Sequence, residues 1–110
     1  MASEETARLG EVEQWVLLAV LRLGDDAYAV PIRDLIHREA GVLLPRGSIY
    51  VTLDRLEEKG LVGSYVGEPT GLPGGKARRM FRSLPAGVRA LRSARRAVQR
   101  LSAGTALVRK

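Results

Sequence analysis

The hydrophobic period of the chain changes at Gly60, and this change restricts the fold more than any other feature of the sequence. Before this glycine, apolar residues recur every three or four positions in successive segments, which is the spacing of one face of an α-helix. After it, the stretches LVGSYVG and MFRSL favour extended backbone, and the turn-rich stretch EPTGLPGG separates them. The sequence therefore predicts three helices followed by a β-hairpin.

Turn residues separate the first two expected helices. The first spans residues 11–23 and is apolar nearly all round, which is typical of a helix that is central or shared between subunits. The turn signal GDDAY follows it. Pro31 suits the first turn of the second helix, where a missing N–H costs nothing, and Gly41 provides a stop.

The third expected helix has a polar, charged back and a narrow apolar stripe. The stripe, spaced by four and three residues, consists of Ile49, Leu53 and Leu56. Either the Ser48 side chain or the Gly47 backbone can serve as the N-cap. We expect Gly60 to close the helix and Leu61 to pack back on it.

A fourth helical segment begins at Pro85, and its apolar residues are spaced by three, three, four and three positions, close to a heptad pattern. These residues are Val88, Leu91, Ala94, Val98 and Leu101. The order helix, helix, helix, hairpin is that of a winged helix-turn-helix. The expected fold class is therefore mainly α (α+β), a winged helix-turn-helix with a C-terminal dimerisation helix.

Charge is divided unevenly along the chain. Residues 1–68 hold all 12 acidic residues and 7 basic ones, whereas residues 69–110 hold 11 basic residues and no acid. A basic segment of this kind favours contact with a polyanion such as nucleic acid, although a solvated basic face explains the same charge.

Several classes of protein are disfavoured by composition. The chain has no cysteine, so disulfides and thiolate metal sites are excluded. Its longest apolar stretch, WVLLAVL, is too short to span a bilayer, and the polar N-terminus is unlike a secretory signal, so we expect a cytoplasmic protein. The single histidine, His37, lacks a second firm metal ligand. No nucleophile–base pair or phosphate loop is visible, and we expect neither an enzyme nor a bound cofactor.

A helix of this kind, followed by a basic hairpin, can read DNA. The second helix of a helix-turn-helix enters the major groove, where arginine, serine and threonine bond base edges or phosphates. The acidic residues near the end of the third helix would be repelled by phosphates, so its N-terminal half should approach the DNA. The residues expected to contact DNA are Arg46, Ser48, Tyr50, Thr52 and Arg55 in the helix, and Lys76, Arg78 and Arg79 in the wing.

Three segments of the chain match a known family in order and spacing: LGEVEQWVLLAVLRLGDDAYAVPIRDLI, SIYVTLDRLEEKGLV and GGKARRMFRSLPAGVRAL. Through these segments the sequence resembles the PadR-family transcriptional regulators over residues 9–101. Met80 stands where the family usually has an aromatic residue, and Leu84 where it has a threonine, which leaves Ser83 as the candidate cap of the last helix. Because only one helix follows the hairpin, the chain is similar to the short-tailed branch of the family.

The resemblance implies a homodimeric repressor in which the last helix packs on the first helix of the partner. The implied dimer interface comprises Val12, Trp15, Val16, Ala19, Val88, Leu91, Ala94, Val98 and Leu101. Several relatives sense small aromatic or drug-like molecules, and Trp15 is the candidate ligand contact here, although plain core or interface packing is the commoner role of such a tryptophan.

The expected organisation has four parts. Residues 1–9 form a flexible N-terminus, residues 10–84 a winged helix-turn-helix DNA-binding domain, residues 85–104 a C-terminal dimerisation helix, and residues 105–110 a flexible tail. The expected partners are double-stranded DNA with a pseudo-palindromic operator and a second copy of the chain. A protein-interaction module without specific DNA binding is the alternative, because winged helices also bind proteins.

Overall fold

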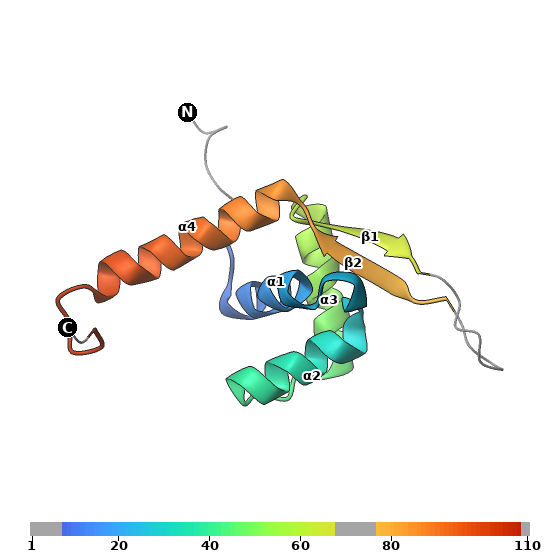
Figure 1. Ribbon diagram of the computed structural model, residues 1–110, viewed down its shortest axis with the longest axis horizontal. Coiled ribbons are helices and arrows are strands. Elements are labelled where there is room, and N and C mark those ends of the chain that lie inside the picture. The colour runs from blue at the N-terminus through green and yellow to red at the C-terminus, as the bar shows by residue number, and fades with distance from the viewer. Residues whose placement is uncertain (1–7, 68–76, 109–110) are drawn as a thin grey trace.

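The computed structural model describes residues 8–67 and 77–108 of the 110-residue chain. Its helices and strands follow one another in the predicted order (Figure 1). They are α1 (Glu11–Leu23), a 3₁₀ turn (Gly24–Asp26), α2 (Ala29–Ala40), α3 (Arg46–Glu58), β1 (Val62–Val66), β2 (Arg79–Ser83) and α4 (Pro85–Ser102). In these residues, no helix is long and apolar enough to cross a membrane.

Helix α1 has the bounds predicted from the sequence. At its start the carboxylate of Glu13 accepts a hydrogen bond from the backbone N–H of Gly10 at 2.8 Å, which satisfies one of the free donors of the first turn. Gly24 ends it with a φ of 57°, in the left-handed region that glycine enters without steric cost.

Helix α2 begins at Ala29, so Pro31 is its third residue. A proline there removes no helical hydrogen bond, because the N–H groups of the first turn have no partner within the helix. The helix ends at Gly41, whose φ is 74° and whose N–H donates to the carbonyl of His37. The predicted start and stop of this helix are both confirmed.

Helix α3 differs from its prediction at its start and agrees with it at its end. Pro45 occupies the N-cap position, so the prediction of Ser48 or Gly47 as the cap is wrong. Ser48 lies inside the first turn, and its N–H donates to the carbonyl of Pro45 at 3.0 Å. At the other end, the N–H of Gly60 donates to Glu57 at 2.9 Å and that of Leu61 to Leu56 at 2.9 Å. This paired pattern is the Schellman motif, and it directs the chain into β1.

The two strands form an antiparallel hairpin, the wing. Val62 pairs with Ser83 at its base, and Val66 pairs with Arg79 toward its tip. The N–H of Phe81 donates to the carbonyl of Ala27 at 2.9 Å, so a backbone hydrogen bond joins β2 to the segment between α1 and α2. The wing is therefore held to the helical bundle by backbone as well as by side chains.

One core joins the three helices, the base of the wing and the first turns of α4. Its fully buried large side chains are Val16, Leu17, Val20, Ile32, Ile49, Leu53, Leu56, Leu61, Val62 and Phe81. Helix α4 enters this core through Ala90 and Leu91 and then extends away from the bundle, on the side opposite the wing (Figure 1). No side chain caps α4, since Leu84 is its N-cap, so the candidate cap Ser83 is not used.

Candidate nucleic-acid interface

The outer face of α3 is the first part of the candidate interface. Its three stripe residues are fully buried, as predicted, which turns the opposite side of the helix to solvent. Tyr50 is 40% and Val51 52% exposed, and Arg46 and Arg55 are also exposed. A Cβ added to Gly47 would meet open space. The N-terminal half of α3 is therefore accessible and free of acidic residues.

Thr52 was predicted to lie on this outer face, and that prediction is wrong. The residue is only 7% exposed, and its hydroxyl donates a hydrogen bond of 2.8 Å to the carbonyl of Ser48. It follows Val51 by 100° around the helix, which is enough to carry its side chain into the core. Val51 is the exposed neighbour, although it was not among the residues predicted to contact DNA.

Arg55 lies on the flank of α3 that faces the start of α1. Beside it, the ammonium of Lys59 donates to both carboxylate oxygens of Glu13, at 2.8 and 2.9 Å. Burial raises the pKa of Glu13, but hydrogen bonds from Lys59 and from the Gly10 backbone outweigh this effect and hold its pKa below 4.5. The positive charge of Arg55, which precedes Lys59 by one helical turn, acts in the same direction.

The predicted wing arginines make contacts within the protein. The guanidinium of Arg78 lies over the ring of Tyr28, 4.6 Å from its centre, where a cation is attracted by the aromatic face. Arg79 turns toward α3, and Arg82 lies 5.7 Å from the ring centre of Tyr65. Lys76, also predicted to contact DNA, lies outside the residues that the structure describes.

Arg79 forms two ion pairs with α3. One terminal nitrogen lies 3.0 Å from Asp54 Oδ1, and the other lies 2.6 Å from Glu57 Oε1. The second oxygen of Glu57 accepts a hydrogen bond of 2.6 Å from the hydroxyl of Ser64. The hydrogen bonds from Ser64 and Arg79 hold the pKa of Glu57 below its ordinary value. Burial lowers the pKa of Arg79, but its bonds to the two carboxylates outweigh this and raise it.

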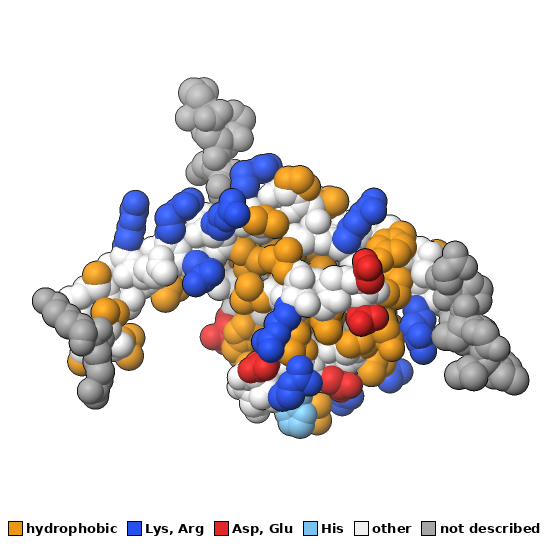
Figure 2. Space-filling model, in the orientation of Figure 1, with side chains coloured by type: hydrophobic (Ala, Val, Ile, Leu, Met, Phe, Trp, Pro, Cys, Tyr) orange, Lys and Arg blue, Asp and Glu red, His pale blue; other side chains and the backbone are white. Residues whose placement is uncertain are grey.

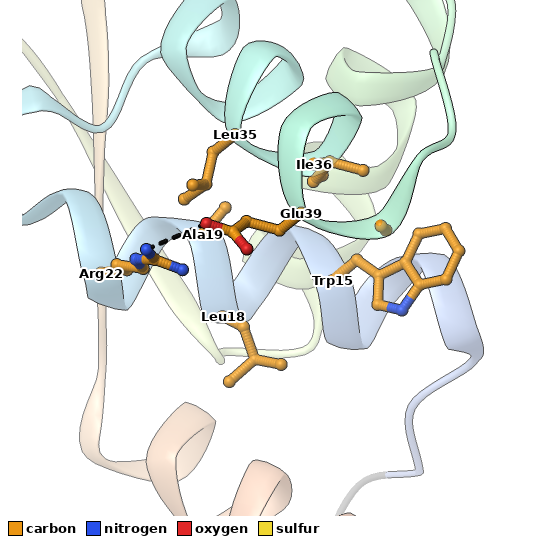
Figure 3. Close-up of a pocket in the computed structure, with 8 residues that line it drawn as sticks. Trp15, Leu18, Ala19, Arg22, Leu35, Ile36 and Glu39 are labelled. Carbon is orange, nitrogen blue, oxygen red and sulfur yellow. Dashed lines mark hydrogen bonds and ion pairs between the residues drawn. The ribbon is translucent and has the colours of Figure 1, made fainter.

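A hollow of about 190 Å³ lies between α1 and α2, away from the wing (Figure 3). Its lining is mostly apolar and consists of Trp15, Leu18, Ala19, Arg22, Leu35, Ile36, Glu39 and Ala40. Arg22 and Glu39 form an ion pair of 3.1 Å across its edge. Trp15, the candidate ligand contact, is one of the residues that line this hollow.

The predicted dimer residues fall into two groups. Val16, Ala19 and Leu91 are at most 4% exposed within a single subunit, so their side chains retain almost no surface for a partner. The prediction that these three residues form a dimer interface is therefore wrong, because their side chains pack in the core of their own chain. The others keep accessible surface, and they are Val12, Trp15, Val88, Ala94, Val98 and Leu101.

The largest apolar exposure among the predicted interface residues is at the end of α4. Val98 is 60% and Leu101 81% exposed. On α1, Leu18 and Leu21 are 43% and 42% exposed, although the sequence analysis did not place them at an interface. Figure 2 shows several Lys and Arg side chains along the outer edge of α4.

The described segments contain no candidate metal-binding site. No group of three or more histidine, cysteine, aspartate or glutamate side chains is close enough there to hold an ion. His37 is exposed on α2.

Comparison with known proteins identifies the fold. No family model and no curated protein matches the sequence. A PadR family transcription regulator from Clostridium difficile R20291 is 21% identical and aligns over 84% of this chain and 95% of its own, with a TM-score of 0.70. A padr family transcriptional regulator from Eggerthella lenta is 24% identical over 86% of this chain and 81% of its own, with a TM-score of 0.66.

A PadR-like transcriptional regulator from Bacillus cereus is 16% identical and aligns over 83% of this chain and 84% of its own, with a TM-score of 0.67. The chain thus has the winged-helix fold of PadR-like transcriptional regulators over most of its length. The fold predicted from the sequence, mainly helical with a small antiparallel sheet, is confirmed.

Proposed function

We propose that the protein is a homodimeric, sequence-specific DNA-binding transcriptional regulator of the PadR family, acting as a repressor in the cytoplasm. The observation that carries the proposal is the exposed, acid-free N-terminal half of α3, presented beside a basic wing in the fold of known regulators. It is proposed as a regulator and not as an enzyme.

The N-terminal half of α3 enters the major groove in this proposal. Arg46 and Arg55, on its two flanks, bond base edges or phosphates, and the methyl groups of Val51 can touch a thymine methyl. The hydroxyl of Tyr50 and the backbone near Ser48 lie where a phosphate oxygen can approach the helix N-terminus. We retain residues 10–84 as the DNA-binding domain.

The wing supplies contacts to the sugar-phosphate backbone. We assign this role to Arg78, because a guanidinium over an aromatic ring keeps the N–H groups at its rim free for a phosphate. We retain Lys76 in this role on the sequence alone. Such contacts release counterions, so DNA affinity should fall steeply as the salt concentration rises.

Dimerisation uses the exposed apolar surface of α4 and α1. Val98 and Leu101 are proposed to pack against α1 of the second copy, near Leu18 and Trp15. Residues 85–104 then form the dimerisation helix, and two α3 helices about 34 Å apart read a pseudo-palindromic operator. The hollow lined by Trp15 is the proposed site of a small aromatic effector that shifts the spacing of the two reading helices.

A mobility-shift titration tests the proposal. The unsubstituted protein should select a defined sequence from a random duplex library and bind it at least about a thousandfold more tightly than unrelated DNA. Arg55→Ala should relax base preference at one position and cost about tenfold in affinity for the selected duplex.

Arg96→Gln is the matched control, because it removes one positive charge from α4, far from the proposed DNA contacts. It should leave the selected sequence unchanged. Failure of the unsubstituted protein to prefer any sequence, with only weak salt-sensitive association, would support a protein-interaction module instead.

A further inference from the structure

Arg79 is placed by the register of the wing so that it faces α3. It pairs with Val66 across the hairpin and lies on the same face of the sheet as Phe81, whose side chain is fully buried. Its guanidinium lies 4.9 Å from the centre of the Phe81 ring. The side chain therefore runs along the inner face of the wing, toward the carboxylates of α3.

Both terminal nitrogens of Arg79 are engaged there. One bonds Asp54 and the other bonds Glu57, residues one turn apart on the exposed side of α3. Glu57 also accepts a hydrogen bond from Ser64 of β1. The network thus joins α3 to both strands of the wing, although no residue of the network is fully buried.

The carboxylates lie close to the surface proposed to meet DNA. Asp54 follows Val51 and Tyr50 by three and four positions, so it continues the same exposed face of the helix. Left unpaired, its charge and that of Glu57 would repel nearby phosphates. The guanidinium of Arg79 offsets one of the two negative charges and at the same time fixes the angle between the wing and the helix.

We propose that Arg79 is a positioning residue for DNA recognition: it clamps the wing to α3 through Asp54 and Glu57, offsets part of their negative charge, and does not itself bind a phosphate. This inference rests on the proposed function and replaces the phosphate contact that the sequence suggested for Arg79. Recognition by the whole surface then depends on a residue that touches no DNA.

The specificity ratio, which is the affinity for the selected duplex divided by that for an unrelated duplex, separates the two roles. Loss of a phosphate contact weakens binding to all sequences alike and leaves the ratio unchanged. Loss of a clamp misplaces the wing relative to the bases, so it lowers the ratio.

The experiment is a double-mutant cycle at about 0.1 M salt, with Arg79→Gln on one side and Asp54→Asn with Glu57→Gln on the other. If Arg79 is a clamp, Arg79→Gln alone and the two acid substitutions alone should each lower the specificity ratio roughly fivefold, the size expected for a surface ion-pair network. The variant that combines all three substitutions should have a ratio no lower than either. Removing the two acids should lower the ratio even though it makes the protein more positive. Arg96→Gln, which removes a charge from α4, should leave the ratio unchanged.

Thermal unfolding of each variant in the same buffer establishes that it is folded. Arg79→Lys provides a second variant, because one ammonium cannot bridge both carboxylates in the same way, and it should reduce the ratio by an intermediate amount. An unchanged ratio in Arg79→Gln, with equal losses on both duplexes, would overturn the clamp and leave the proposed function intact. Absence of any sequence preference in the unsubstituted protein would overturn the proposed function itself.

Discussion

The carbonyl oxygen of Leu61 lies directly against Gly87, in a space that admits no side chain. A Cβ added at residue 87 would overlap this oxygen and stand 3.0 Å from the hydroxyl of Ser83. The same carbonyl accepts a hydrogen bond of 2.9 Å from the N–H of Leu84. The start of α4 is thus fixed to the junction of α3 and β1 by a contact that requires glycine.

We expect Gly87→Ala to destabilise the protein by about 1–3 kcal/mol, because the added methyl group must displace backbone and not a flexible side chain. Urea unfolding monitored by circular dichroism measures the change. Gly47→Ala is the matched control, since its Cβ meets open space within α3, and it should stabilise the protein by about 0.5–1 kcal/mol. Destabilisation of equal size by both variants would contradict the proposed packing.

The neighbours Val51 and Thr52 should respond in opposite ways to substitution. Val51→Ala removes exposed methyl groups from the outer face of α3, so we expect about a fivefold loss of preference for thymine at one operator position, with little change in stability. Thr52→Val keeps the buried shape and should leave base preference unchanged. Sequence selection from random duplexes compares the two, and an altered consensus with Thr52→Val would count against the buried placement of that residue.

The Lys59–Glu13 pair should make stability depend on pH in the acidic range. The pKa of Glu13 in the folded protein lies below its ordinary value of 4.5, so its contribution is fully present above that pH and is lost as the pH falls through the folded pKa. We expect Lys59→Met to cost about 1 kcal/mol at pH 7, and the difference from the unsubstituted protein to shrink as the pH falls below 4.5.

Urea unfolding at several pH values measures this difference. Arg22→Met is the comparison variant, because it removes an ion pair whose two side chains are both at least half exposed. It should cost less at pH 7 than Lys59→Met does. A constant cost of Lys59→Met from pH 7 to pH 3 would show that the ion pair contributes nothing to folding.

Val98 and Leu101 should control association. Replacing both with glutamate places charge on the most exposed apolar part of α4, and we expect the dimer dissociation constant to rise at least about 30-fold. Sedimentation velocity over a concentration series measures it. Gln99→Glu with Arg100→Gln alters the neighbouring positions without touching the apolar stripe, and it should leave association nearly unchanged; equal dimerisation by both double variants would place the interface elsewhere.

Local spacing predicted most of the fold. The bounds of α1 and the turn at Gly60 depend on neighbours within a few positions, and the structure has them as expected. The returning strand, predicted at MFRSL, lies one residue earlier in the chain, at Arg79–Ser83. The N-cap of α3 was misplaced because Pro45 carries no capping side chain, and nothing in its chemistry marks the first turn. Helix ends are set by backbone geometry that residue type reveals only in part.

The candidate site was less predictable, because its contacts join residues far apart in the chain. Arg79 meets Asp54 across 25 positions, and no periodicity shows that the two will face one another. The near-heptad stripe of α4 was visible, but its division between the core of the subunit at Leu91 and exposed surface at Leu101 depends on where the helix leaves the bundle. Tertiary packing decides which distant residues come into contact, and a local pattern in the sequence does not reveal it.

The hydrogen bond between Phe81 and Ala27 gives the wing a direct mechanical link to the segment that joins α1 and α2. A tilt of α1 imposed by a neighbouring subunit would therefore reach the hairpin through main-chain atoms without passing through α3. In the proposed dimer, a molecule that displaces α1 would therefore also shift the hairpin relative to the duplex.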